Sequence, residues 1–145
     1  MNNVRFVFAT ADDEEKVREL LIASQLPHED IQPHLRNFIL AKNGDELVGC
    51  VGLEILSGCA LLRSLAVSPL HRSIGLGNQL CVEIHQYARS LHLQTLYLMT
   101  TTASNYFAMR GYEKIDRELA PAAIRDTRQF TDLCPISATV MKMQL

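Results

Sequence analysis

The stretch Leu61–Gly77, LLRSLAVSPLHRSIGLG, organises this chain of 145 residues. Its first half is an apolar run that ends at a Ser-Pro pair. Arg72 follows, and two glycines then stand one residue apart, at Gly75 and Gly77. An apolar stripe at helical spacing continues to about Leu91. This order predicts a strand, a tight turn and an amphipathic helix that begins at the glycines.

The glycine turn predicts a phosphate site. The first turn of a helix leaves backbone N–H groups unpaired and carries the positive end of the helix dipole. Glycines let an anion approach these amides, and Arg72 can add charge-assisted hydrogen bonds. The alternative is a plain bend with Arg72 in solvent. A nucleotide-phosphate binder is disfavoured, because the Walker spacing is absent and Leu80 stands where the dinucleotide fingerprint needs glycine.

Charge, apolar segment length and cysteine spacing exclude several classes of protein. A net charge of -2 without blocks of like charge predicts neither a nucleic-acid nor a membrane-surface partner. No apolar segment has the length of a signal-peptide core or a membrane span. The four cysteines lack C-x-x-C spacing, which predicts reduced, buried thiols in a cytoplasmic protein without a metal site. Cys134 alone has a second interpretation, in which it faces an acceptor pocket. The length predicts a single domain, residues 1–145.

Strand and helix patterns alternate along the chain. The Asn-Gly-Asp run at 43–45 predicts a hairpin, and a helical crossover predicts parallel pairing of the strands on either side of 76–91. The order predicts an α/β (α+β) fold, with one mixed, mostly antiparallel sheet and helices on both faces. Strands are expected at 4–8, 36–42, 46–56, 59–67, 94–100, 112–116 and 137–145, and helices at 10–24, 76–91, 103–110 and 121–127.

Two runs resemble motifs of the GNAT superfamily of acetyltransferases. The run R-x-x-G-x-G, from Arg72 to Gly77, resembles motif A, which binds the coenzyme A pyrophosphate. The run T-x-x-A-x-x-x-F-x-x-x-G-Y, from Thr100, follows the frame of the family's N-x-x-A-x-x-x-Y-x-x-x-G-F marker. The resemblance implies an acyl-CoA N-acyltransferase fold, in which pantetheine lies between a splayed pair of parallel strands. It also implies direct acetyl transfer from acetyl-CoA to a small-molecule amine in a ternary complex, with a homodimer possible by analogy.

The resemblance assigns roles to particular residues. Thr100 and Phe107 depart from the marker, since the family has Asn and a thiolate-protonating Tyr there. Tyr106 is turned about 100° around the helix axis. It either reaches the sulfur as leaving-group acid, or packs or meets solvent. A thiolate with a parent pKa near 8.5 can also leave unprotonated. Coenzyme binding is assigned to Leu65, Ala66, Val67, Arg72, Ser73, Ile74, Gly75, Leu76, Gly77, Thr100 and Phe107.

Two charges inside apolar strands are candidates for the acceptor side. Glu54 could act as the general base or contact the substrate, and its alternative is an exposed strand face. Arg63 could hold a substrate carboxylate or form a structural ion pair with Glu54. The segment 26–33 holds His28, Glu29 and Asp30; its carboxylate pair beside a histidine could face the substrate, but polar loops are usually hydrated and a solvated loop is the favoured interpretation.

The tail carries a narrower resemblance. Together with LLRSLAV and the threonines from Thr100, the run 121–138 resembles the arsenic-resistance branch of N-acetyltransferases. The acceptor expected is a small amine or an amino-acid-like molecule, and a toxic one would suit this branch. The alternative is an acyl-CoA-binding sensor or interaction module with little turnover, which the departures at Thr100 and Phe107 favour.

Overall fold

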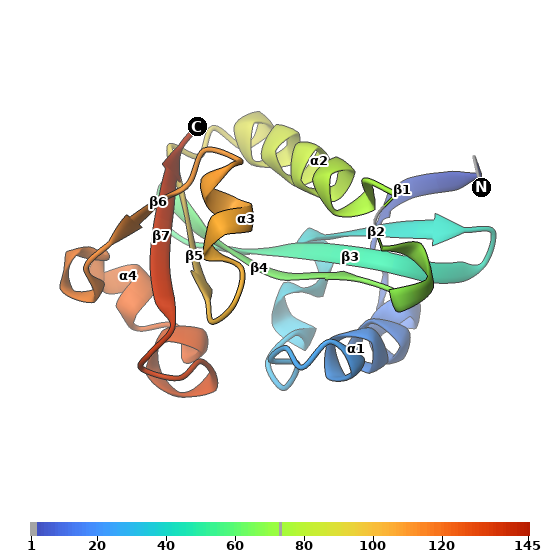
Figure 1. Ribbon diagram of the computed structural model, residues 1–145, viewed down its shortest axis with the longest axis horizontal. Coiled ribbons are helices and arrows are strands. Elements are labelled where there is room, and N and C mark those ends of the chain that lie inside the picture. Colours follow the sequence, from blue (N-terminus) through green and yellow to red (C-terminus); the bar gives the residue numbers. More distant parts are fainter. Residues whose placement is uncertain (1–2, 73) are drawn as a thin grey trace.

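The computed structural model describes residues 3–72 and 74–145 (Figure 1). Seven strands form one sheet in the order β1-β2-β3-β4-β5-β7-β6, with α2 and α3 on one face and α1 and α4 on the other. The strands are β1 (Val4–Phe8), β2 (Phe38–Asn43), β3 (Glu46–Ile55), β4 (Cys59–Val67), β5 (Thr95–Thr100), β6 (Glu113–Ile115) and β7 (Thr139–Gln144); the α-helices are α1 (Glu14–Ala23), α2 (Leu76–Ser90), α3 (Ser104–Ala108) and α4 (Ala122–Arg125).

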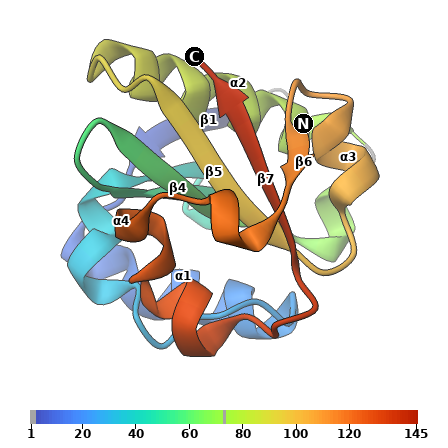
Figure 2. The same cartoon turned by 90° about the vertical axis from the view of Figure 1, so that its left-hand side faces the viewer.

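The pairing confirms the predicted mixed sheet. β4 and β5 are parallel, and the other neighbouring strands are antiparallel. The last strand, β7, lies between β5 and β6, so the tail of the chain is inside the sheet (Figure 2). The arrangement places the ends of β4 and β5 next to the tail, and this proximity forms the site described below.

Two stretches differ from the sequence prediction. The strand expected from residue 36 begins at Phe38, because Gln32–Asn37 forms 3-10 turns with Pro33 in the first turn. A π-helical segment, Gln129–Leu133, was not predicted at all. Ser73, predicted to bind coenzyme, lies outside the described residues.

Apolar side chains fill both faces of the sheet. On α2 the buried stripe Leu76, Leu80, Ile84 and Ala88 recurs every four residues, as the periodicity predicts, and packs on the central strands. α1 and α4 cover two smaller clusters on the other face. The four cysteines are free thiols, three of them buried and Cys134 half-buried. Within residues 3–72 and 74–145, no helix combines the length and the apolar character that crossing a bilayer would require.

Candidate active site

β4 and β5 separate soon after they pair. Their parallel ladder joins only Cys59–Leu61 to Thr95–Tyr97. β5 then stays paired with β7 as far as Thr100, while β4 runs on beside β3 to Val67. The two strands diverge toward their carboxyl ends (Figure 1). The splayed pair implied by the family resemblance is therefore confirmed.

A β-bulge bends β4 where the strands part. Ser64 and Leu65 together stand opposite the single residue Val51, and Ser64 has a positive φ of 62°. Bulges bend a strand and redirect its side chains. Two hydrogen bonds hold this conformation: Arg63 Nε donates to Ser64 Oγ at 3.1 Å, and the Cys50 thiol donates to the Ser64 carbonyl at 3.2 Å.

A cavity of about 690 Å³ occupies the space between the diverging strands. This volume is typical of sites that bind small molecules or cofactors. Its wall includes the ends of β4 and β5, the first turn of α2, part of α3, and segments from the α1 end and the tail. Most of the predicted coenzyme residues line it, namely Leu65, Ala66, Val67, Arg72, Gly75, Leu76, Gly77, Thr100 and Phe107. Ile74 is exposed and does not line the cavity.

The first turn of α2 faces the cavity with its amides free. Gly75 precedes the helix with a φ of 82°, and no side chain of the described residues caps it. The first intrahelical bond is from Gln79 N–H to the Gly75 carbonyl, so the N–H groups of residues 76–78 lack a helical acceptor. Arg72 Nε donates to the Val67 carbonyl at 3.0 Å, which leaves the terminal guanidinium nitrogens for a ligand. The turn can therefore hold an anion.

Gly77 serves a second purpose that the sequence did not indicate. A Cβ built on it would lie 2.7 Å from the Tyr106 hydroxyl oxygen, so α3 packs Tyr106 directly against α2. The Arg110 guanidinium stacks on the tyrosine ring at 3.5 Å from its centroid. Tyr106 lines the cavity, and burial raises the pKa of its hydroxyl, which keeps its proton at neutral pH. Tyr106 thus packs against α2 and also borders the cavity, and its role as leaving-group acid stays a prediction.

The two departures from the family marker have structural explanations. Phe107 is buried and packs edge-on against Tyr112, so most of its ring belongs to the core. The Thr100 hydroxyl accepts a hydrogen bond from the Ala103 N–H at 2.9 Å and so helps to start α3. Both residues border the cavity, and their role in coenzyme binding stays a prediction.

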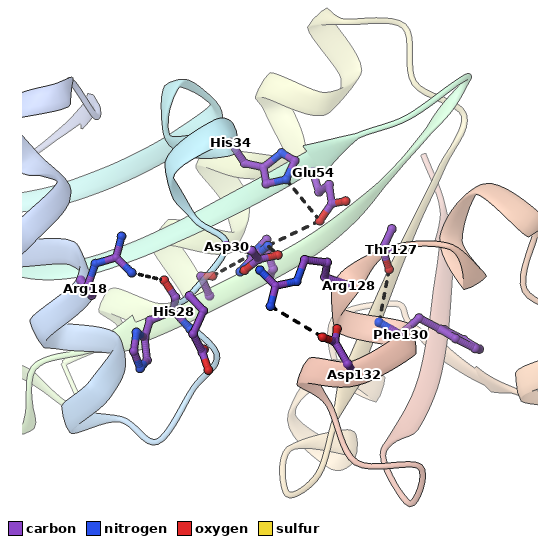
Figure 3. A network of polar contacts seen from close by, with 12 residues as sticks. Arg18, His28, Asp30, His34, Glu54, Thr127, Arg128, Phe130 and Asp132 are labelled. Atoms are coloured by element: carbon purple, nitrogen blue, oxygen red, sulfur yellow. Dashed lines mark hydrogen bonds and ion pairs between the residues drawn. The ribbon is translucent and has the colours of Figure 1, made fainter.

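A buried ion-pair network joins Arg63, which lines the cavity, to Asp30 and Glu54. Figure 3 shows Asp30, Glu54 and the neighbouring His34. Arg63 donates two hydrogen bonds to Asp30, at 2.7 and 2.5 Å, and a longer one to Glu54 at 3.4 Å. His34 Nε2 lies 3.7 Å from Glu54 Oε1. Burial alone would raise the pKa of Asp30, but the hydrogen bonds and charge of Arg63 outweigh it and hold that pKa below its usual value. The prediction that Asp30 belongs to a solvated loop is therefore wrong.

This network shows what the two strand charges contact in the structure. Arg63 lines the cavity, but its side chain is 0% exposed and bonded to Asp30, and its role in substrate binding stays a prediction. Glu54 is 8% exposed, which excludes the solvated strand face, and it does not line the cavity. The structural ion pair between them is confirmed. Asp30, His34 and Glu54 could together approach a metal ion, but the guanidinium already occupies the same oxygens.

Residues distant in sequence close the far end of the cavity. Ser24–Pro27 come from the end of α1, and Gln129, Leu133 and Cys134 come from the tail. Only Cys134 was considered a candidate from the sequence, and burial raises the pKa of its thiol, which stays neutral. Local sequence carries no signal for the others, because they meet only when β7 enters the sheet. We call this part of the cavity, formed by 24–27 and 129–135, the distal end.

Comparisons with known proteins agree with this geometry. The model of the acetyltransferase (GNAT) family matches residues 5–116. Amino-acid acetyltransferase from Ectopseudomonas mendocina (strain ymp) is 32% identical over 97 residues, which make up 66% of this chain and 22% of that protein. The corresponding protein from Neisseria meningitidis serogroup A is 27% identical over 99 residues, 67% of this chain and 23% of the relative. The chain thus spans less than a quarter of the length of these curated relatives.

Solved structures share the whole fold. N-acetylglutamate synthase from Neisseria gonorrhoeae, complexed with coenzyme A and N-acetyl-glutamate, superposes with a TM-score of 0.84 at 22% identity, over 98% of this chain and 35% of that chain. Rv2747 from Mycobacterium tuberculosis, in complex with CoA and NLQ, gives a TM-score of 0.81 at 21% identity, over 97% and 99% of the two chains. The splayed β4–β5 pair and the start of α2 beside it agree with the family match over residues 5–116. This protein belongs to the acetyltransferase (GNAT) family.

Proposed function

We propose that this protein is an acetyl-CoA-dependent N-acetyltransferase that acts on the amine of a small, amino-acid-like acceptor by direct transfer in a ternary complex. The observation that supports the proposal is the cavity between β4 and β5, which is lined both by the first turn of α2, whose first amides have no acceptor within the helix, and by the distal segments 24–27 and 129–135. A donor and an acceptor can therefore bind together and meet where the strands part.

The coenzyme occupies the α2 side in this proposal. Its diphosphate accepts hydrogen bonds from the N–H groups of residues 76–78, where the helix dipole favours negative charge. Arg72 adds a cation, and the pantetheine arm runs along Leu65–Val67 in place of a neighbouring strand. Crystal structures of relatives with coenzyme A bound support this use of the fold.

The transfer step needs an oxyanion site and a leaving thiolate. The acceptor nitrogen attacks the thioester carbonyl carbon, and a backbone N–H near Val67 stabilises the negative oxygen of the tetrahedral intermediate. The carbon–sulfur bond then breaks, the nitrogen loses its extra proton to water, and the thiolate takes a proton from Tyr106, which regains one from water. Tyr106 is protonated at neutral pH, so its hydroxyl can donate a hydrogen bond to the sulfur as negative charge develops there.

The acceptor amine enters as its free base. Among the described residues that line the cavity there is no carboxylate, and Glu54 stands behind Arg63. An amine that loses its proton to water before binding needs no protein base. We therefore expect the pH at which kcat/KM levels off to follow the pKa of the acceptor across a series of amines, and Glu54→Gln to leave that pH unchanged. A constant pH midpoint for all amines would indicate a base on the protein.

The acceptor class rests on the relatives and on the small distal end. The matched proteins are amino-acid acetyltransferases, and the distal end is formed by a few short segments. An arsenic-containing amino acid of the kind the sequence resemblance suggests belongs in the substrate panel. The four free thiols support a reducing compartment such as the cytoplasm. The homodimer suggested by the same resemblance is testable by sedimentation.

A coenzyme-binding sensor is the second candidate, because Phe107 replaces the family's tyrosine and packs into the core. Thiol release over a panel of amines distinguishes the two functions. Release that depends on one class of amine supports the transferase. Tight coenzyme binding with no release above background for any amine supports the sensor.

Gly75 offers a matched test of the coenzyme site. A Cβ there would meet no atom within 4 Å, and the positive φ of 82° strains every other residue to a similar degree. Gly75→Ala and Gly75→Glu thus share the backbone strain and differ in charge. We expect calorimetry to show at least roughly tenfold weaker coenzyme A binding for Gly75→Glu than for Gly75→Ala. Equal affinities would place the diphosphate elsewhere.

A further inference from the structure

Gln129 lines the distal end of the cavity with a largely buried side chain. The residue is 4% exposed, and no hydrogen bond between described residues includes its side-chain amide. The two amide atoms are not among the buried polar atoms that lack a partner, so they keep some contact with the solvent that fills the cavity. A largely buried amide in the wall of a cavity is thus a position where a ligand can supply hydrogen-bond partners.

The segment that carries Gln129 is held firmly. Its wide turn is closed by a hydrogen bond from Cys134 N–H to the Gln129 carbonyl at 2.9 Å, and π turns of this kind are frequent at functional sites. The Thr127 hydroxyl accepts a hydrogen bond from the Phe130 N–H at 3.3 Å (Figure 3). The Arg117 guanidinium stacks on the Phe130 ring at 4.3 Å from its centroid. The amide is therefore positioned before any ligand arrives.

The charges near the distal end are already engaged. Arg63 is bonded to Asp30 and Glu54, and Arg110 stacks on Tyr106. Ser24 also lines the cavity, and its hydroxyl is buried without a partner among the described residues. The distal end thus offers neutral hydrogen-bond donors to an acceptor, while its cations are held by other groups.

We infer that Gln129 determines acceptor specificity, and that its N–H groups donate to a carboxylate oxygen of the acceptor. The inference rests on the proposed function, and it specifies the substrate class as amines that carry a carboxylate close to the nitrogen. A site with a buried donor discriminates against an analogue that lacks the oxygen, because the donor is then left unpaired. Gln129 is a binding residue, and acetyl transfer itself does not pass through it.

The test compares two acceptors and two variants. The acceptors are an amino acid and the amine that remains when its carboxylate is removed, such as alanine and ethylamine. Gln129→Met keeps the length of the side chain and removes the donor, while Gln129→Glu keeps the shape and adds a negative charge. We expect Gln129→Met to lower kcat/KM for the amino acid by roughly 10- to 100-fold, with Gln129→Glu lower still. The value for the simple amine and the KM for acetyl-CoA should stay within about twofold.

Binding of the amino acid to the protein–coenzyme A complex, measured by calorimetry, gives the same comparison without turnover. Equal losses for both acceptors, or no loss in Gln129→Met, would overturn the inference. Failure of the proposed function looks different, since the wild-type protein would then release no thiol with any amine. A carboxylate preference in calorimetry that the variants abolish would still support the role of Gln129.

Discussion

Replacing Gly77 by alanine tests how α2 and α3 meet at the cavity. The new Cβ would lie 2.7 Å from the Tyr106 hydroxyl oxygen and 3.7 Å from Cζ, while ordinary contacts begin at 3.4 Å. The hydroxyl oxygen must therefore retreat by roughly 0.7 Å, and the ring must move with it because the two are bonded rigidly. Alanine is also the better helix former, by up to about 1 kcal/mol, so the fold should not be weakened.

The proposed acid makes this displacement costly for catalysis. A misplacement on the order of 1 Å can lower a rate by about 100-fold, and Tyr106 cannot move without its stacked partner Arg110. We expect Gly77→Ala to lower kcat by roughly 10- to 100-fold, with a melting temperature within about 2 °C of wild type. Steady-state thiol release gives kcat, and calorimetry gives the affinity for coenzyme A.

A double-mutant cycle separates this effect from a direct clash with the coenzyme. Tyr106→Phe removes the one atom that lies too close, so Gly77→Ala should have little further effect on kcat in that background. A loss of coenzyme A affinity that remains in the double variant would mean that the new Cβ at residue 77 contacts the diphosphate directly. Equal losses of kcat from Gly77→Ala in both backgrounds would refute the contact with Tyr106.

Three further predictions concern stability. The lowered pKa of Asp30 means that its ion pair with Arg63 stabilises the protein above about pH 3.8 and that this contribution is lost as the pH falls through the lowered value. Asp30→Asn should lower the free energy of unfolding, measured with urea at pH 7, by about 3–5 kcal/mol, and it should weaken the dependence of that free energy on pH in the acid range. The same pH dependence in the variant and the wild type would contradict the assignment. Ser64→Ala should be about 1 kcal/mol less stable than Ser64→Gly, because only glycine adopts the positive φ of 62° without strain. A Ser64→Gly variant that is less stable than Ser64→Ala would contradict the positive φ at this bulge. Burial lowers the pKa of His85 to about 4, below its ordinary 6.5, so the unfolded chain gains a proton first and stability should decline as the pH falls from 6.5 to 4. His85→Gln should reduce this loss of stability at low pH, which urea titrations at several pH values would measure. If the variant loses as much stability as the wild type between pH 6.5 and 4, His85 is not the cause of the loss.

The parts of the fold that could be predicted have local signals. β4 begins and ends at the predicted residues because its apolar run is bounded by turn residues on both sides. The hairpin before it follows from the Asn-Gly-Asp run, and the parallel β4–β5 pair follows from the helical crossover. The glycine turn is also local, and its conformation at Gly75 is the one that glycine favours.

The parts that could not be predicted depend on contacts across the chain. Asp30 and Arg63 are 33 positions apart, and the polar loop around Asp30 gave no sign of a buried partner. Polar composition indicates that a loop is hydrated on average, but one strand charge beneath it can reverse this for a single residue. Gln129 joins the cavity only because β7 is inserted between β5 and β6. The bulge at Ser64 likewise has no signature in the run LLRSLAV.

A crystal structure with coenzyme A bound is the most direct test of the central claim. The account predicts diphosphate oxygens within about 3.2 Å of the backbone nitrogens of residues 76–78, with the pantetheine arm along Leu65–Val67 and its sulfur near the Tyr106 hydroxyl. A diphosphate bound away from the start of α2, or a pantetheine arm outside the gap between β4 and β5, would contradict it.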